Sequence, residues 1–341
     1  MKKKSEESKK KRVVASALIF FLFCLAVLSA ENKIFGYKDK EEWSTDRRIS
    51  QYRELKENTI DVLIVGSSHM MSGIAAPLLW EKSGISAYNY VSRNQTVPFT
   101  YLSLKEALKT QKPKLIIFDI SILINPSDYY GLVYDEYHAH INLDTLPLSA
   151  EKIKLMSEYL PVKEQINYYL PFLRFHTRWK ELSGYDFGRR NGQDGEYPIY
   201  NGFCIVKDVW EKEIVTQELP VNLSERWQAY FQKMMELCKE KGIEVLFLDI
   251  PNGQNITWEG MPYAYLNGNQ LEEEIGYQEK TDARDETHMN VFGAIKFTNY
   301  LNEYLKQNYE LSDHRGEAGY EQMEEICQSF REEMQEQGIT K

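Results

Sequence analysis

Four short apolar segments, separated by stretches of helical spacing, constrain the fold of this chain more than any other feature. They cover residues 61–65, 87–91, 114–120 and 243–250. Each is rich in Val, Ile, Leu, Tyr or Phe and short enough to be a single buried strand. Strands that alternate with helices form parallel sheets, so the pattern predicts an α/β fold.

Helical spacing follows these strands at 75–83, 97–110, 222–241 and 290–307. Apolar residues recur there every three or four positions, which is typical of helices that cover a sheet. Residues 255–284 lack a regular pattern and are expected to be irregular. The order of the elements therefore predicts helices on both faces of a central parallel sheet.

The first predicted strand ends in Gly66, Ser67 and Ser68, a tight turn that presents a serine where a helix should begin. A serine hydroxyl is a weak nucleophile unless a base takes its proton. Much later in the chain, Asp285 and His288 precede the last core helix. His288 can act as the base near neutral pH, and Asp285 can orient its imidazole. Backbone N–H groups of the serine turn, helped by the helix dipole, could stabilise an oxyanion.

These two segments resemble the SGNH (GDSL-type) hydrolase family. Gly66-Ser67-Ser68 stands where the family has Gly-Asp-Ser, which assigns the nucleophile to Ser68 and not to Ser67. Asp285-Glu286-Thr287-His288 matches the closing D-x-x-H block of the family, and Asn290 and Gly293 stand at the usual helix start. The chain looks most like the membrane-anchored envelope branch, which includes DltD-like proteins and relatives that often work with membrane-bound O-acyltransferases.

The resemblance covers roughly residues 58–125 and 240–310. It implies a flavodoxin-like three-layer sandwich with a central parallel sheet and a Ser68, His288 and Asp285 triad. It implies no cofactor and no metal.

Two blocks depart from the family pattern. Tyr88–Gln95 resembles the second block, but the usual glycine is missing, and either Ser92 or Asn94 would lie at the oxyanion position beside the N–H of Ser68. Asn94 tolerates a left-handed backbone and could replace a glycine. The third block, Gly-x-Asn-Asp, is missing after the strand at 115–120, as it is in the DltD-like branch. One missing oxyanion donor costs about 3–4 kcal/mol of transition-state stabilisation.

The N-terminus predicts a membrane anchor. Residues 1–12 form a basic tail. Residues 13–30 carry no charge, and this run is just long enough to cross a bilayer core. The basic flank predicts a single-pass protein of the cell membrane, with a cytoplasmic N-terminus and an extracytoplasmic main domain. A signal peptide is the competing interpretation. Residues 31–57 are expected to be a juxtamembrane stalk.

The main domain is expected over residues 58–310, with a helical insertion at about 126–220 that would form a cap over the site. Within the insertion, Pro161 and Pro171 should interrupt helices. Residues 311–341 form an acidic C-terminal tail, helical in part, with an apolar stripe. The stripe consists of Tyr320, Met323, Ile326 and Phe330. Asp313-His314-Arg315-Gly316 resembles a tail motif of the envelope branch.

Charge and cysteine content exclude several classes of protein. A net charge of −10 disfavours nucleic-acid binding, which needs a basic face. Cys204, Cys238 and Cys327 have no zinc-ligand spacing and do not form a disulfide framework, although a Cys204–Cys238 pair stays open. Cys24 is best explained as an apolar residue of the membrane helix.

Other polar side chains have simpler explanations than catalysis. His69 is expected to point away from Ser68 and to pack or lie on the surface. His138 and His140 form an H-x-H pair that could bind a metal, but a solvated loop fits better. His176 is expected in an aromatic core, and Arg93 on the surface rather than on an anionic substrate. Asp282 is a weaker alternative to Asp285.

These features predict a serine-dependent acyl-ester hydrolase or O-acyltransferase acting on a cell-envelope glycan or related polymer. The acylated polymer is the expected substrate, and a membrane-bound O-acyltransferase is the partner that the resemblance suggests. A non-catalytic, membrane-anchored binding or assembly protein is the main alternative, favoured by the missing third block. A lipase or phospholipase is a third hypothesis, which requires a more apolar cap.

Overall fold

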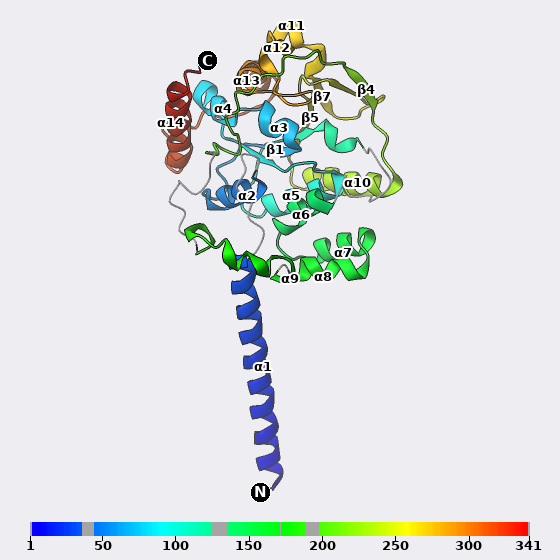
Figure 1. Ribbon diagram of the computed structural model, residues 1–341, viewed down its shortest axis with the longest axis vertical. Helices are drawn as coiled ribbons and strands as arrows, with labels where there is room; N and C mark the ends of the chain where they lie inside the picture. The colour runs from blue at the N-terminus through cyan, green and yellow to red at the C-terminus, as the bar shows by residue number, and fades with distance from the viewer. Residues whose placement is uncertain (1, 36–43, 125–135, 171, 188–197, 340–341) are drawn as a thin grey trace. The chain divides into compact units, whose positions relative to one another are not determined.

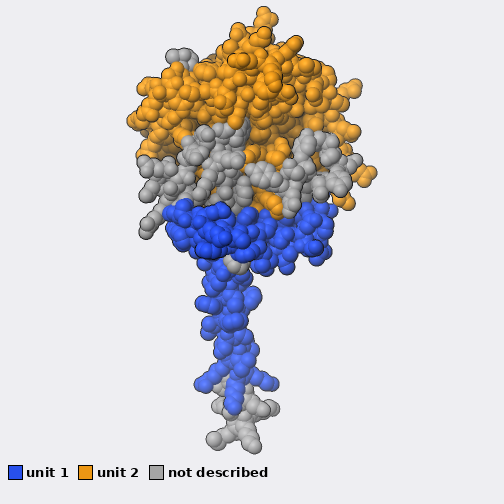
Figure 2. Space-filling model, in the orientation of Figure 1, with its two compact units in different colours: residues 1–38, 156–194 blue, residues 39–155, 195–341 orange. Residues whose placement is uncertain are grey.

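The structure is a computed structural model, and it divides into two compact units (Figure 2). Unit 1 contains Met1–Lys38 and Met156–Asp194, and unit 2 contains Asp39–Leu155 and Gly195–Lys341. The structure describes residues 2–35, 44–124, 136–170, 172–187 and 198–339.

Unit 2 is built on a parallel sheet of five strands in the order β2-β1-β3-β5-β7. The strands are β1 (Val62–Gly66), β2 (Ala87–Val91), β3 (Leu115–Asp119), β5 (Glu244–Asp249) and β7 (Ala264–Asn267). The predicted α/β class with a central parallel sheet is confirmed. Strand β7 lies in the region expected to be irregular, because it is an edge strand of only four residues, too short to give a recognisable pattern.

Helices cover both faces of this sheet (Figure 1). One face carries α3 (Ser68–Gly73), α4 (Ala76–Ser83) and α13 (Val291–Asn308), and the other carries α2 (Thr45–Glu54), α5 (Val97–Ala107) and α10 (Glu225–Glu240). Successive residues of a strand point to opposite faces, and β1, β2 and β3 are buried along their whole length, so both of their faces pack against other parts of the fold. On the α10 face, the ring of Phe247 lies between those of Phe118 and Phe231, at centroid distances of 5.4 and 5.9 Å.

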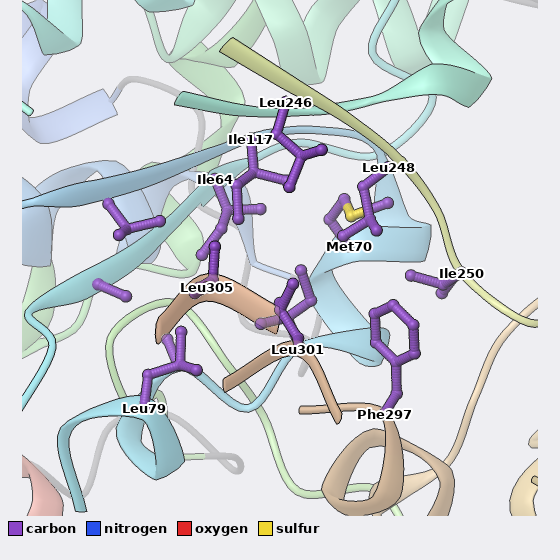
Figure 3. Close-up of a cluster of buried hydrophobic side chains, with 14 of the residues drawn as sticks. Ile64, Met70, Leu79, Ile117, Leu246, Leu248, Ile250, Phe297, Leu301 and Leu305 are labelled. Carbon is purple, nitrogen blue, oxygen red and sulfur yellow. The ribbon is translucent and has the colours of Figure 1, made fainter. Parts of the chain in front are cut away.

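The largest apolar cluster fills the space between the sheet and α3, α4 and α13 (Figure 3). Ile64, Ile117 and Leu246 come from three neighbouring strands, and Met70 and Phe297 come from the helices. Burying each large side chain stabilises the fold by roughly 1.5–3 kcal/mol. This packing holds the start of α3, and hence Ser68, against the sheet.

The remaining elements of unit 2 are shorter. Strands β4 (Gln217–Pro220) and β6 (Gln254–Thr257) form a separate parallel pair. The others are η1 (Ile120–Leu123), α6 (Glu136–Asp144), η4 (Gly268–Gln270), α11 (Glu272–Ile275), α12 (Glu279–Asp282) and α14 (Glu321–Glu336), while α7 (Ala150–Tyr159) begins in unit 2 and ends in unit 1.

The predicted stalk at 31–57 is wrong for residues 45–54, which form α2 and pack on the sheet. Tyr52 is buried between the rings of Tyr88 and Tyr90, at centroid distances of 5.0 and 4.6 Å. Arg48 is fully buried and donates hydrogen bonds to the carbonyl oxygens of Gly202 and Ser44 at 2.7 and 2.9 Å. The charged sequence of this segment is compatible with burial, because the fold supplies backbone acceptors for the Arg48 donors.

The acidic C-terminal segment is also part of the folded unit rather than a separate tail. Helix α14 packs on α4, and Trp80 Nε1 donates to Glu324 Oε2 at 2.8 Å. The predicted stripe holds for Met323 and Phe330, whereas Ile326 is only partly buried. The buried residues of α14 are Met323, Cys327, Phe330 and Met334.

His314 ties the segment before α14 to the start of β1. Its Nε2 lies 2.7 Å from Asp61 Oδ2, its Nδ1 lies 2.6 Å from Glu317 Oε2, and its ring stacks on Tyr320 at 4.2 Å. Burial lowers the pKa of His314, but the hydrogen bonds to Glu317 and Asp61 outweigh this effect, so the pKa is raised above 6.5. The imidazolium therefore clamps the C-terminal segment to the sheet.

We expect the protein in detergent to lose stability as the pH rises through the raised pKa of His314. The folded state holds this proton more tightly than the unfolded state, so the stabilisation is complete below pH 6.5 and disappears above the folded pKa. The His314→Gln variant should lack this decrease in melting temperature. Exposed His176→Gln is the control, and an unchanged pH slope in His314→Gln would contradict the clamp.

Unit 1 contains α1 (Lys2–Phe35), α8 (Val162–Tyr169), α9 (Phe172–Phe175), η2 (His176–Lys180) and η3 (Gly184–Phe187). Within α1, Lys9–Glu31 is long and apolar enough to cross a membrane, as the sequence predicts, or to be a signal sequence. The single insertion expected at 126–220 is divided, since Met156–Asp194 groups with α1. Its expected role as a cap stays a prediction.

Candidate active site

The candidate nucleophile follows β1 at the carboxyl end of the sheet. Ser67 is the N-cap of α3, and its side chain accepts a hydrogen bond from the backbone N–H of His69. Gly66 precedes it because the chain passes very close to β3: a Cβ at this position would lie 2.1 Å from the Cβ of Asp119. The strand order changes direction between β1 and β3, and in open α/β sheets ligands bind at such a point.

Asp119 holds this turn in place. Its carboxylate accepts hydrogen bonds from the backbone N–H and the hydroxyl of Ser67, at 2.9 and 2.5 Å, and from the N–H of Ser121 at 2.8 Å. The Ser67 hydroxyl is therefore occupied, which leaves Ser68 as the serine that faces outward. Asp119 is not among the site residues that the sequence predicts, although an acid at the carboxyl end of a predicted strand is a usable signal.

Ser68, His288 and Asp285 come together in one hydrogen-bonded chain. Ser68 Oγ lies 2.8 Å from His288 Nε2, and His288 Nδ1 lies 2.9 and 3.0 Å from the two carboxylate oxygens of Asp285. Because a carboxylate only accepts, this network assigns the proton to Nδ1 and leaves Nε2 free to accept from the serine hydroxyl. This arrangement has the geometry of a nucleophile, base and orienting acid.

Asp285 is held as a carboxylate. Burial raises its pKa, but hydrogen bonds from His288 and from the backbone N–H of Thr287 outweigh burial and lower the pKa to about 2. Asp285 Oδ1 accepts from the N–H groups of Thr287 and His288 at 2.9 and 3.0 Å. The acid is thus oriented by its own loop as well as by the imidazole.

The loop that carries Asp285 and His288 is fixed at both ends. Arg284 N–H donates to the carbonyl oxygen of His288 at 2.8 Å, and Asn290 caps α13 by accepting from Phe292 and Gly293. Gly293 is required by close packing, since a Cβ there would lie 2.5 Å from the carbonyl oxygen of Asp282.

Asp282, the weaker alternative acid, does not orient His288. Its carboxylate is buried and accepts from Lys296 Nζ at 2.7 Å and from the N–H of Gln278 at 2.7 Å. These bonds anchor α12 to α13 and leave the imidazole to Asp285.

The structure overturns the expectation that His69 points away from the site. The His69 ring lies 5.2 Å from the His288 ring between centroids, because both extend from the first turn of α3 and its facing loop into the same space. Burial lowers the pKa of His69 to about 4, His288 adds to this lowering, and Asp119 opposes it. His69 is therefore uncharged at neutral pH, and its Nδ1 is buried without a hydrogen-bond partner among the described residues. The uncharged His69 ring therefore lies beside His288, the candidate base.

The two oxyanion candidates after β2 are not equivalent. The Ser92 N–H donates to the carbonyl oxygen of Gly66 at 3.1 Å, and its hydroxyl lies 3.1 Å from that of Thr45, so neither group is available to an oxyanion. Asn94 has φ +45°, the left-handed conformation that an asparagine tolerates, and is half-buried. Of the two, Asn94 remains a candidate beside the N–H of Ser68.

The structure also places the other polar residues that the sequence singled out. His140 Nδ1 lies 3.8 Å from Asp144, and within the described ranges no group of three His, Cys, Asp or Glu side chains could hold a metal ion. His176 is exposed, which contradicts the expected aromatic core position. Arg93 is half-buried. Cys204, Cys238 and Cys327 are buried and form no disulfide, so the Cys204–Cys238 pair that the sequence left open is not formed.

We expect Asp119→Ala to slow the reaction of Ser68 without removing it. The substitution removes the acceptor of three donors, so the turn that carries Ser68 can move. A misplacement of the Ser68 hydroxyl by about 1 Å costs roughly 100-fold in rate. The measurement is the rate of covalent labelling by a fluorophosphonate, with melting temperature recorded in parallel. Asp119→Asn keeps one acceptor and should recover part of the rate, whereas wild-type labelling of Asp119→Ala would refute the role of Asp119.

No protein-family model matches this chain, and no curated protein is similar to it in sequence.

Proposed function

We propose that this chain is a serine-dependent acyl-ester hydrolase or O-acyltransferase of the SGNH type. One observation carries the proposal: the hydrogen-bonded chain from Ser68 through His288 to Asp285 at the carboxyl end of a parallel sheet. A drifted structural site has no chemical need for all three groups in this order.

The proposed reaction has two halves. Ser68 Oγ attacks the acyl carbonyl carbon while His288 Nε2 takes the hydroxyl proton, and Asp285 stabilises the imidazolium that forms. Collapse of the tetrahedral intermediate breaks the ester bond, and His288 returns the proton to the departing alcohol. Water or a sugar hydroxyl then attacks the acyl-enzyme by the same route, which gives hydrolysis or transfer.

The developing oxyanion would be bound by the N–H of Ser68 and by Asn94. Ser68 begins α3, so its N–H has no intrahelical acceptor. One donor is worth about 2.7–4 kcal/mol in such a site, which makes Asn94 important in the absence of a third-block asparagine.

The fold supports the assignment to the SGNH type. When strands are counted along the chain, the sheet has the order 2-1-3-4-5, which is the flavodoxin-like order. The serine follows the first strand, and the D-x-x-H block precedes the last sheet-covering helix, α13. A flavodoxin-like three-layer sandwich would bring these two segments to the same edge.

The substrate and location follow from the anchor and the resemblance. Helix α1 would cross the cell membrane once, with the basic residues 1–12 in the cytoplasm and unit 2 on the outer side. An acylated cell-envelope glycan or related polymer would then be in reach. A membrane-bound O-acyltransferase would be the partner that supplies or receives the acyl group.

Covalent labelling of the full chain by a fluorophosphonate tests the proposal, because the probe reacts with an activated serine. We expect labelling of the wild type, none of Ser68→Ala, and at least about 100-fold slower labelling of His288→Ala. His176→Ala, an exposed histidine, is the matched control. If the folded wild type is not labelled, the non-catalytic assembly protein becomes the better description.

A further inference from the structure

Unit 1 exposes an unusual set of large apolar side chains outside α1. On α8, Val162 and Ile166 lie one turn apart on the same face and are 82% and 48% exposed. Leu173, Trp179 and Phe187, in α9, η2 and η3, are 48%, 62% and 61% exposed. We call these five residues the apolar collar. An exposed apolar surface of this kind marks a region that binds a membrane or another molecule.

Three of the four elements that carry the apolar collar contact α1, and the fourth, α8, packs on α9. Helix α9, η2 and η3 all pack against α1. Arg178 Nη1 donates to the carbonyl oxygen of Ile34 at 3.4 Å. Arg178 is itself fixed by Asp186 at 2.8 Å. These contacts lie within unit 1, so they define the place of the collar relative to α1.

The helical rise per residue gives the distance of this contact from the end of the uncharged run of α1. Ile34 is four residues beyond Ala30, the end of the uncharged run, which is about 6 Å along the axis at ~1.5 Å per residue. The headgroup region extends roughly 5–7 Å beyond the hydrocarbon core on each side. The contact between Arg178 and Ile34 is therefore at the level of the headgroups if α1 crosses the membrane.

We propose that the apolar collar binds the outer lipid interface around the exit of α1. The inference rests on α1 crossing the membrane and does not depend on the proposed acyl chemistry. Trp and Phe are suited to this layer, because their rings are apolar and Trp carries a polar N–H. The segment 156–187 contains four basic and four acidic residues, so binding is driven by apolar burial and not by attraction to anionic lipids.

Spin labels on the full chain in phosphatidylcholine vesicles test the proposal. The nitroxide is attached at Val162→Cys, Leu173→Cys or Trp179→Cys in a Cys24→Ala background, where the other cysteines are buried. Leu22→Cys reports insertion of α1, and Val215→Cys, 78% exposed in unit 2, is the matched aqueous control. The measurement is the accessibility to oxygen, which concentrates in lipid, divided by that to a water-soluble nickel complex.

We expect the ratio at the three collar positions to exceed the ratio at Val215 several-fold and to fall below that at Leu22. Raising the salt concentration should leave the collar ratios unchanged. Ratios equal to that of Val215, with Leu22 in lipid, would overturn the collar. Labels shielded from both reagents would also overturn it, because they would indicate a second copy of this chain on the surface. An aqueous Leu22 would remove the premise.

Discussion

Replacing Ser68 by Ala should reduce turnover of an activated aryl ester by about 10⁴-fold or more, because the acyl-enzyme can no longer form. The Ser68 hydroxyl bonds to His288 Nε2, and both residues are only half-buried, so water can replace the lost hydroxyl at Nε2. The melting temperature should stay close to that of the wild type. The measurement is steady-state hydrolysis by purified full-length protein in detergent.

Ser67→Ala is the informative control for this prediction. The Ser67 hydroxyl bonds to Asp119 and caps α3, so its loss should lower stability and slow the reaction by a much smaller factor. If Ser67→Ala abolishes turnover and Ser68→Ala retains it, the assignment of the nucleophile is wrong. Equal activity of Ser68→Ala and the wild type would mean that the observed hydrolysis does not use this site.

Asp285→Asn should reduce the rate of acylation by roughly 10⁴-fold while leaving the fold intact. An asparagine can present its N–H₂ group to His288 Nδ1, which favours the wrong tautomer and places the proton on Nε2, where it blocks the serine. The measurement is single-turnover labelling of the variant and the wild type. Glu286→Gln removes the same charge at the exposed neighbouring position and should react at nearly the wild-type rate.

The pH dependence adds a second check on Asp285. Its pKa of about 2 means that the carboxylate is almost fully ionised between about pH 4 and 8, so protonation of Asp285 should not slow the wild-type reaction in this range. An Asp285→Asn rate within tenfold of the wild type would contradict the orienting role.

Much of the fold could be predicted from the sequence because the signals are local. Strands β1, β3 and β5 contain continuous apolar runs, and β2 is interrupted only by Asn89. The covering helices carry periodic apolar residues, and Asn290 caps α13 through its own side chain. Strand β7 escaped because a short edge strand derives its pairing from β5 rather than from its own composition.

Some features of the candidate site could be predicted from the local sequence, and others depend on residues far apart in the chain. The D-x-x-H spacing is enough for Asp285 to reach His288, since the two are three residues apart in one loop. No local pattern reveals that Asp119 occupies the Ser67 hydroxyl, or that the Ser92 N–H is used by Gly66, because both partners come from another strand. The lowered pKa of His69 arises from burial and from His288 and is likewise a property of the assembled site.

By itself, the sequence determined the α/β class, the apolar N-terminal helix and the pairing of an acid with a histidine before α13, because hydrophobic periodicity and short loop spacing act over a few residues. Only the tertiary structure decided that Ser68 faces His288, that His69 lies beside the base, and that α2 and α14 belong to the folded unit. The physical reason is that burial and hydrogen-bond partners are set by residues far apart in the chain, which the sequence does not bring together until the sheet has formed.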